Sequence, residues 1–190
     1  MVRKLTATIT VLAAFAALLS LSVLALFTDT ASVPGNTFST GTVDISTSPT
    51  SALVTFSGMA PGDQVTNPIT VTNAGTLALR YAVTSTTTEN TLAAQLDLTI
   101  KSGVTTCTNA GFGTDGTVRY GAADLGSTTG INVIGDPTQG AQAGDRTLAA
   151  SASEILCFNV SLPSGTGNAY QGLTSTATFA FQAEQTANNP

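Results

Sequence analysis

The residue types that most often carry catalysis or bind metal ions are scarce in this chain. It contains no histidine, so serine and cysteine hydrolases lose their usual general base and an HExxH zinc site is excluded. Its two cysteines, Cys107 and Cys157, form no CxxC pair, and no histidine is available to complete a tetrahedral set around them. We therefore expect no catalytic residue, no metal site and no cofactor, and a protein that is not an enzyme.

The cysteines have a second possible chemistry, which is a disulfide. An even number of cysteines in a chain that is sent to an oxidising compartment favours such a bond. We interpret Cys107 and Cys157 as a disulfide pair, with two buried free thiols as the alternative. Closing a loop of this size stabilises the fold by roughly 4 kcal/mol in the chain-entropy model.

Several acidic residues lie in Gly-rich stretches, where carboxylates can reach a calcium ion. None of them has the alternating ligand spacing of an EF-hand, so solvated turn residues are the preferred interpretation. No pair of carboxylates stands out for glycoside chemistry, and few aromatic residues are available to stack on a sugar. The candidate calcium-contacting residues are Asp115, Asp124, Asp136 and Asp145.

The elements that position these residues are expected to be strands. Apolar residues alternate with Thr and Gln over short segments, and Gly, Pro and Asn separate them. The tight turn Met59-Ala60-Pro61-Gly62-Asp63 precedes one strand, and a short Asn/Gly turn at residues 73–75 predicts a hairpin between two others. A short helix is plausible at Thr86–Gln95. The predicted strands are Ala52–Phe56, Ile69–Thr72, Leu77–Val83, Leu96–Ile100, Val118–Tyr120, Ile131–Ile134, Ile155–Leu162 and Ala177–Ala183.

About eight strands at this spacing predict an all-β fold, an antiparallel β-sandwich of the jelly-roll or immunoglobulin type with long Gly/Thr-rich loops. Residues 101–150 are expected to be mostly surface loop with one or two edge strands. Asn159-Val160-Ser161 has the form of a glycosylation sequon, but it falls inside a predicted core strand. We expect Asn159 to be unmodified.

Charge patterning excludes two classes of partner. Charged residues make up 9% of the chain and the formal net charge is −5. The basic residues that follow the first few positions are scattered singly, whereas phosphate contacts need clustered Lys and Arg. We expect neither nucleic-acid binding nor attraction to an anionic membrane surface.

The N-terminal segment has the layout of a secretory leader. Arg3 and Lys4 precede an uncharged, strongly apolar run from Leu5 to Thr28. Small residues at the −3 and −1 positions, where this run stops, favour cleavage by a signal peptidase. An uncleaved membrane anchor is the alternative, because the run is long enough to span a bilayer. We expect residues 1–25 to be a signal peptide. The mature protein is then secreted, and the chain contacts the membrane only transiently, through this leader. The residues of the expected cleavage site are Val23, Ala25 and Leu26.

Cleavage there frees an arm of residues 26–46, ahead of a sandwich domain of residues 47–190. The arm is extended in pattern and carries apolar residues on one side, as strand addition between subunits requires. Such head-to-tail contacts generate filaments. The alternative is that the arm is simply the first strand of its own sheet. The expected contact residues of the arm are Phe27, Phe38, Val43 and Ile45.

Three segments resemble the TasA/CalY (camelysin) family of exported proteins: ALFTDTASVPGNTFSTGTVDIS after the leader, then MAPGDQVTNPITVTNAGTLALRYAV, and NAYQGLTSTATFAFQAEQT near the C-terminus. They occur in the family's order. The resemblance implies processing by a SipW-type signal peptidase and a jelly-roll domain that assembles into fibres of the extracellular biofilm matrix. In those fibres, as in the similar archaeal bundling pili, the N-terminal strand of one subunit completes the sheet of an identical neighbour.

This resemblance makes residues 26 to about 45 the donor strand. The cysteine pair and the Gly/Thr-rich middle differ from the best-known fibre-forming members. Some members carry a metalloprotease label, which we do not transfer because no zinc-binding set is recognisable. A camelysin-like secreted metalloprotease and a monomeric cell-surface adhesin or binding module remain the alternatives to a structural fibre protein.

Overall fold

The computed structural model describes Thr6, Ile9, Gly35 and residues 37–50 and 58–189. The chain divides into two units, Met1–Ser39 and Thr40–Pro190. Few residues of the first unit are described, so the fold below is that of the second. The strand predicted at Ala52–Phe56 lies outside the described residues. In the part of the chain that is described, no helix has the length and apolar character needed to cross a membrane.

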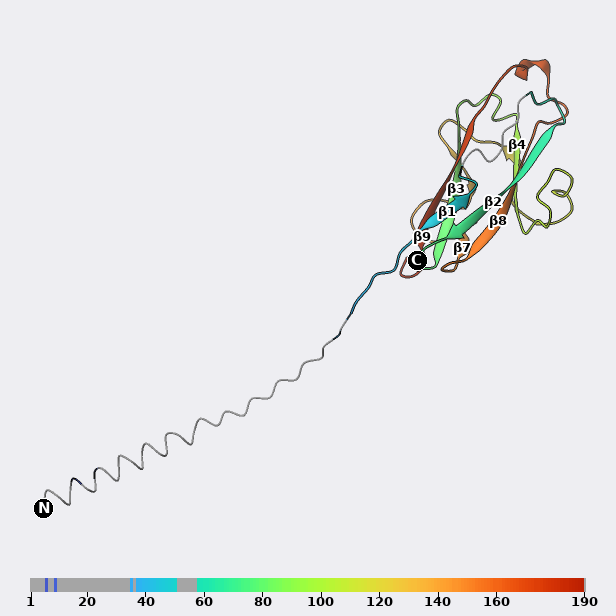
Figure 1. Cartoon of the computed structure of the whole chain (residues 1–190). Helices are drawn as coiled ribbons and strands as arrows, with labels where there is room; N and C mark the ends of the chain where they lie inside the picture. The colour runs from blue at the N-terminus through green and yellow to red at the C-terminus, as the bar shows by residue number, and fades with distance from the viewer. Residues whose placement is uncertain (1–5, 7–8, 10–34, 36, 51–57, 190) are drawn as a thin grey trace. The chain divides into compact units, whose positions relative to one another are not determined.

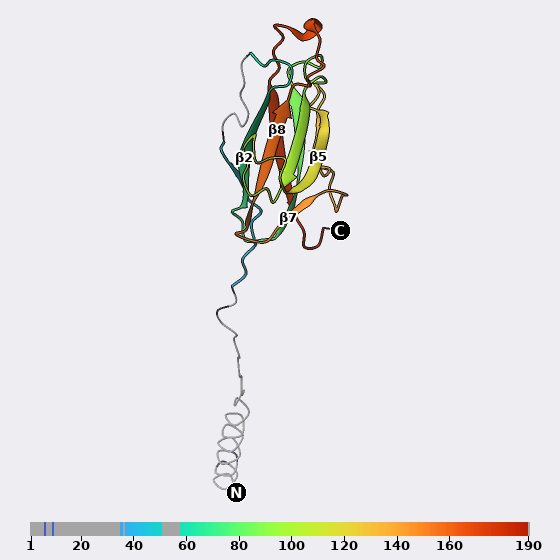
Figure 2. The ribbon, with the colours of Figure 1, turned by 90° about the vertical axis from the view of Figure 1, so that its right-hand side faces the viewer.

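The second unit is an all-β sandwich of two antiparallel sheets, as predicted (Figure 1). One sheet has the strand order β1-β2-β8-β4-β5, and Figure 2 shows β8 between β2 and β5. In the other sheet β3 is central, with β9 on one edge and β6 and β7 on the opposite edge. The strands are β1 Ile45–Ser48, β2 Gln64–Asn73, β3 Leu79–Thr87, β4 Asp97–Ser102, β5 Thr117–Asp124, β6 Ile131–Ile134, β7 Arg146–Leu148, β8 Ser153–Ser161 and β9 Ala177–Gln185, with a short 3-10 helix at Asn168–Tyr170.

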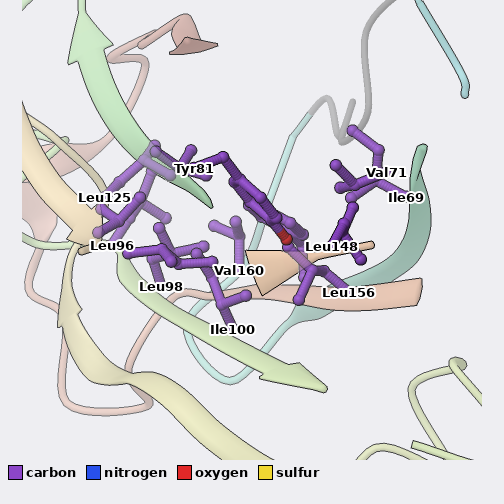
Figure 3. Close-up of a cluster of buried hydrophobic side chains, with 14 of the residues drawn as sticks. Ile69, Val71, Tyr81, Leu96, Leu98, Ile100, Leu125, Leu148, Leu156 and Val160 are labelled. Atoms are coloured by element: carbon purple, nitrogen blue, oxygen red, sulfur yellow. The ribbon is translucent and has the colours of Figure 1, made fainter. Parts of the chain in front are cut away.

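Alternating apolar residues of the two sheets meet in one core (Figure 3). Leu156 and Phe158 of β8 face Tyr81 and Val83 of β3, and all four side chains are at most 1% exposed. Burying each large side chain contributes roughly 1.5–3 kcal/mol. The alternating apolar residues from which the strands were predicted are therefore the residues that face the core.

The turn predicted after Met59 is confirmed. The N–H of Asp63 donates to the carbonyl of Ala60 at 2.9 Å, and Gly62 has a φ of 98°. Pro61 fits the first corner of such a turn and a left-handed glycine the second. The strand that follows is longer than predicted, since it begins at Gln64 rather than Ile69.

The hairpin predicted around residues 73–75 is wrong. β2 pairs with β1 and β8, whereas β3 belongs to the other sheet, so the connection crosses from one sheet to the other. The fully buried side chain of Asn73 holds this crossing. Its amide donates to the carbonyls of Leu77 and Ala149 at 2.8 and 3.0 Å, and its oxygen accepts the N–H of Gly75 at 2.9 Å. β2 and β3 each have one strongly apolar face. They bury more apolar surface when these faces pack together in opposite sheets than when the strands are neighbours in one sheet.

The short helix expected at Thr86–Gln95 is also wrong in extent. Thr86 and Thr87 continue β3 and pair with β9, as β-branched residues favour. Hydrogen-bonded turns rather than a helix follow, with the N–H groups of Ala94 and Leu96 donating to the carbonyls of Asn90 and Leu92 at 3.1 and 2.9 Å. The loop-rich middle contains three strands, β5, β6 and β7, where one or two were expected.

A partly buried polar cluster links the two sheets at the rim of this core. The hydroxyl of Tyr81 donates to Oε1 of Glu154 at 2.9 Å, and Arg146 makes an ion pair with the same carboxylate. Burial raises the pKa of Tyr81, and the charge of Glu154 raises this pKa further. The phenol therefore stays protonated in the folded protein at pH values where it ionises in the unfolded chain.

We expect this cluster to make the protein alkali-sensitive. Because the pKa of Tyr81 is higher in the folded state, its contribution to stability is complete below about pH 10 and falls by about 1.4 kcal/mol per pH unit above that value. Urea unfolding between pH 9 and 11.5 measures the slope. Tyr81→Phe should reduce it, leaving the smaller contribution of Tyr120, whose pKa burial also raises. An unchanged slope in the variant would assign the effect to other groups.

Candidate assembly edge

The most distinctive feature of the sandwich is an edge of β9 that pairs with no described strand. This strand pairs with β3 over its whole length, from Ala177 opposite Thr87 to Gln185 opposite Leu79. No strand of the described residues pairs with its other edge, which we call the β9 edge. A free edge offers a row of backbone N–H and C=O groups to a further strand.

The side chains of β9 that face the core are only partly covered. Phe179 packs edge-on against Phe158 with ring centroids 5.0 Å apart, and Phe181 lies 6.1 Å from Tyr81. Phe158 and Tyr81 are buried, yet Phe179 and Phe181 remain half-buried. An additional strand beside β9 would cover both rings.

The sheet opposite has a partly free edge as well. β1 pairs with β2 only from Thr70 to Asn73, so Gln64–Ile69 pair on one side only among the described strands. Pro68, which has no N–H to offer, lies in this part of β2, where a proline is tolerated. The candidate assembly site is therefore the β9 edge, with the first half of β2 as a second exposed edge.

Part of the expected donor arm is held by the chain's own body. Ile45 belongs to β1, where it is paired with Asn73 and packs against the core. Just before it, the carbonyl of Thr42 accepts the N–H groups of Thr76 and Leu77 at 3.0 and 3.1 Å. Gly75 is required here, since a Cβ would come within 2.4 Å of the Thr42 carbonyl. The structure thus places Thr40–Ser46 with the sandwich.

The described residues before Thr40 differ from this anchored part. Phe38 is 94% exposed, whereas Val43, which lies in the anchored part, is 39% exposed. An exposed phenylalanine ring contributes no burial free energy to the single chain, and it would contribute such free energy if a neighbouring molecule covered it. The other expected arm contact, Phe27, and the cleavage residues Val23, Ala25 and Leu26 lie outside the described residues.

The disulfide between Cys107 and Cys157 is confirmed, with Cα atoms 5.6 Å apart. It fastens the loop between β4 and β5 to the central strand β8. Lys101 strengthens the attachment, since its ammonium donates to the carbonyl of Phe112 at 2.7 Å and lies 4.6 Å from the centroid of that ring. The loop is thereby fixed to the outer face of the five-stranded sheet.

Two of the candidate calcium-contacting residues, Asp115 and Asp145, accept hydrogen bonds from backbone N–H groups of loops. Asp115 accepts the N–H of Thr105, and Asp145 accepts the N–H groups of Asp136 and Gln142. Asn159 of the sequon is 5% exposed, and its amide donates to the hydroxyl of Thr66 at 2.7 Å. Its burial fits the expectation that it is not glycosylated.

Sequence reasoning missed Phe179 and Phe181 as candidate binding residues. Their alternation predicted a strand, but the pattern is the same for a central strand and for an edge strand. The alternation therefore gave no signal that one edge of this strand pairs with no described strand.

The comparison with known families identifies the group of proteins to which this chain is related. The family described as camelysin metallo-endopeptidase matches residues 1–189. The chain belongs to the camelysin (TasA/CalY) family. This family is one of secreted or cell-surface proteins. A search of curated proteins finds no significant match.

The camelysin description implies a metal ion, and the residues of this chain can be compared with what such an ion needs. Zinc in peptidases is held by His, carboxylate or Cys ligands. This chain has no histidine, and both cysteines are in the disulfide. Within residues 37–50 and 58–189, no three Cys, Asp or Glu side chains gather to hold a metal. The described residues therefore do not fit a zinc site, and no catalytic step through a metal follows from them.

Proposed function

We propose that this camelysin-family protein is a secreted structural subunit. It polymerises into extracellular fibres of the biofilm matrix by N-terminal strand donation between identical chains. The observation that carries the proposal is the β9 edge, where the rings of Phe179 and Phe181 are half-buried and no described strand pairs. Cleavage before Leu26 by a SipW-type signal peptidase during export would release the donor.

Because residues 40–46 are held by their own sandwich, we limit the proposed donor strand to Leu26–Ser39. Thr40 begins the compact unit, and β1 already pairs with β2, so Val43 and Ile45 stay with their own subunit. Fourteen extended residues reach about 46 Å, whereas the nine residues of β9 span about 30 Å. The segment is therefore long enough to lie along the whole β9 edge of a neighbour.

Two purified forms, one starting at Leu26 and one at Thr40, test the proposal by electron microscopy. We expect filaments from the longer form and monomers from the shorter one, with equal thermal stability. A truncation at Thr40 removes no residue of β1 or of the Thr42 contacts, so loss of assembly cannot be attributed to a damaged sandwich. Filaments from both forms would contradict strand donation by residues 26–39, and monomers from both would favour a monomeric adhesin or binding module.

The family description favours a second function, metal-dependent peptide hydrolysis. Cleavage of casein by the purified protein measures it. Activity that a chelator abolishes and added zinc restores would support a peptidase and would place the metal site outside the described residues. The proposal of a structural subunit expects no such activity.

A further inference from the structure

A polar pocket lies on the outer face of the sheet that contains β3 and β9. The loop between β6 and β7 folds over the strands there and encloses a cavity of about 210 Å³ that is open to solvent. Arg80 of β3, Gln182 and Glu184 of β9, and Gln139 of the loop line it. The pocket faces outward, so it is distinct from the β9 edge.

Arg80 is the unusual member of this pocket because it is 6% exposed and incompletely paired. Its Nε lies 2.9 Å from Oε1 of Glu184, but it makes no hydrogen bond with good geometry to any described residue. Its terminal nitrogens have no hydrogen-bond partner among the described residues either. Only Nε is fully buried without a described partner, whereas the terminal nitrogens still reach the solvent of the pocket, so their N–H donors are available to a ligand.

The walls of the pocket are fixed before any ligand arrives. Glu184 accepts the N–H of Gly140 at 3.0 Å through Oε1, which leaves Oε2 free. Asp145 accepts the N–H of Asp136 at 3.0 Å, and Asp136 accepts the N–H of Thr138 at 2.8 Å. Hydrogen bonds from Thr138 hold the pKa of Asp136 below its usual value. A pre-organised loop loses little entropy when a ligand binds.

The charges and free groups restrict the class of ligand. One guanidinium and three carboxylates give the pocket a net negative charge, which disfavours a free anion. A metal cation is disfavoured because Asp136 and Asp145 already accept loop N–H groups and Arg80 is adjacent. The groups still available to hydrogen-bond a ligand are N–H donors of Arg80 and one carboxylate oxygen of Glu184. The side-chain amides of Gln139 and Gln182 each offer a donor and an acceptor. A hydroxyl both donates and accepts, so neighbouring hydroxyls can bridge a guanidinium and a carboxylate.

We propose that this pocket binds one unit of a neutral sugar, with Arg80 and Glu184 contacting adjacent hydroxyls and Gln139 and Gln182 contacting the rim of the ring. No aromatic ring stacks on the ligand, so the dissociation constant for a single unit is about 1–10 mM. The proposal goes beyond polymerisation and holds for a monomer as well as for a fibre. Its failure would leave strand donation untouched.

Saturation-transfer NMR on the secreted protein tests the proposal, because it reports weak ligands of monomers and filaments alike. The probes are glucose, galactose and N-acetylglucosamine, with glucuronate and inorganic phosphate as anionic comparisons. We expect saturable binding of at least one neutral sugar, tighter than that of either anion. The double variant Gln139→Ala/Gln182→Ala should weaken it by roughly tenfold, since two hydrogen-bonding amides are lost from the surface without a core change.

Thr178→Ala is the matched control, because Thr178 is exposed and lies on the same outer face of β9 but does not line the pocket. This variant should bind as the unaltered protein does. Three results would overturn the proposal: no saturable binding of any neutral sugar, tighter binding of glucuronate or phosphate, or unchanged sugar binding in the double variant.

Discussion

Replacing Cys107 and Cys157 together by alanine is expected to lower the free energy of unfolding by about 4 kcal/mol, a figure set by the loop that the bond closes. The two cysteines are 50 residues apart in the sequence, so their bond removes many conformations from the unfolded chain. For a chain of this size, a loss of about 4 kcal/mol lowers the melting temperature by roughly 8–16 °C. Urea unfolding and thermal melts measure both quantities.

Alanine is preferred over serine here because Cys157 is 1% exposed, and a buried hydroxyl without a partner would add a separate cost. Replacing both residues leaves no free thiol to link two chains. Treatment of the unaltered protein with dithiothreitol is the matched control and should give nearly the same loss. A difference of less than about 1 kcal/mol between oxidised protein and double variant would contradict the chain-entropy account.

The strands could be predicted from the sequence because their cause is local. In β8, residues 156, 158 and 160 face the core, and the alternation that places them there is present in the letters ILCFNVSL. The disulfide was predictable for a similar reason, since export and the cysteine count restrict the chemistry. The turn at Pro61-Gly62 follows from the backbone preferences of two residues.

The pairing of strands could not be predicted in the same way because its cause is not local. Residues 73–75 have the composition of a hairpin turn, but Asn73 is bound by carbonyls of the β7–β8 connection, about 75 residues away. Which strand is left at an edge is decided by the same long-range packing. Thus Phe179 and Phe181 were predicted to lie in a strand, and only the arrangement of the sheets shows that no described strand pairs with one side of it.

The same distinction applies to the polar pocket. Arg80 and Glu184 are more than a hundred positions apart, and their neighbours in sequence are ordinary strand residues. Residue type makes the acidic residues of the loop candidate calcium ligands, whereas the structure shows Asp136 and Asp145 accepting N–H groups that set the loop's shape. Residue type alone predicts neither arrangement.

Phe38→Asp is expected to abolish filament formation without changing the stability of the monomer. Phe38 is 94% exposed in the single chain, so a charge there meets water and should alter the free energy of unfolding by less than about 0.5 kcal/mol. If residues 26–39 lie along the β9 edge of a neighbour, the same charge would be brought against the rings of Phe179 and Phe181. Burying an unpaired carboxylate costs several kcal/mol, which is enough to prevent each addition step.

Val118→Asp is the matched control for this prediction. Val118 is an apolar surface residue on β5, the edge strand at the far side of the five-stranded sheet from β1, and it is 54% exposed. Its replacement adds the same charge but should leave the filaments intact by electron microscopy and sedimentation. Assembly that is lost in both variants would point to general charge repulsion, and assembly that is kept in Phe38→Asp would remove Phe38 from the donor contact. Loss in Phe38→Asp alone is the result that strand donation requires, because only that residue lies in the segment that must pass from one subunit to the next.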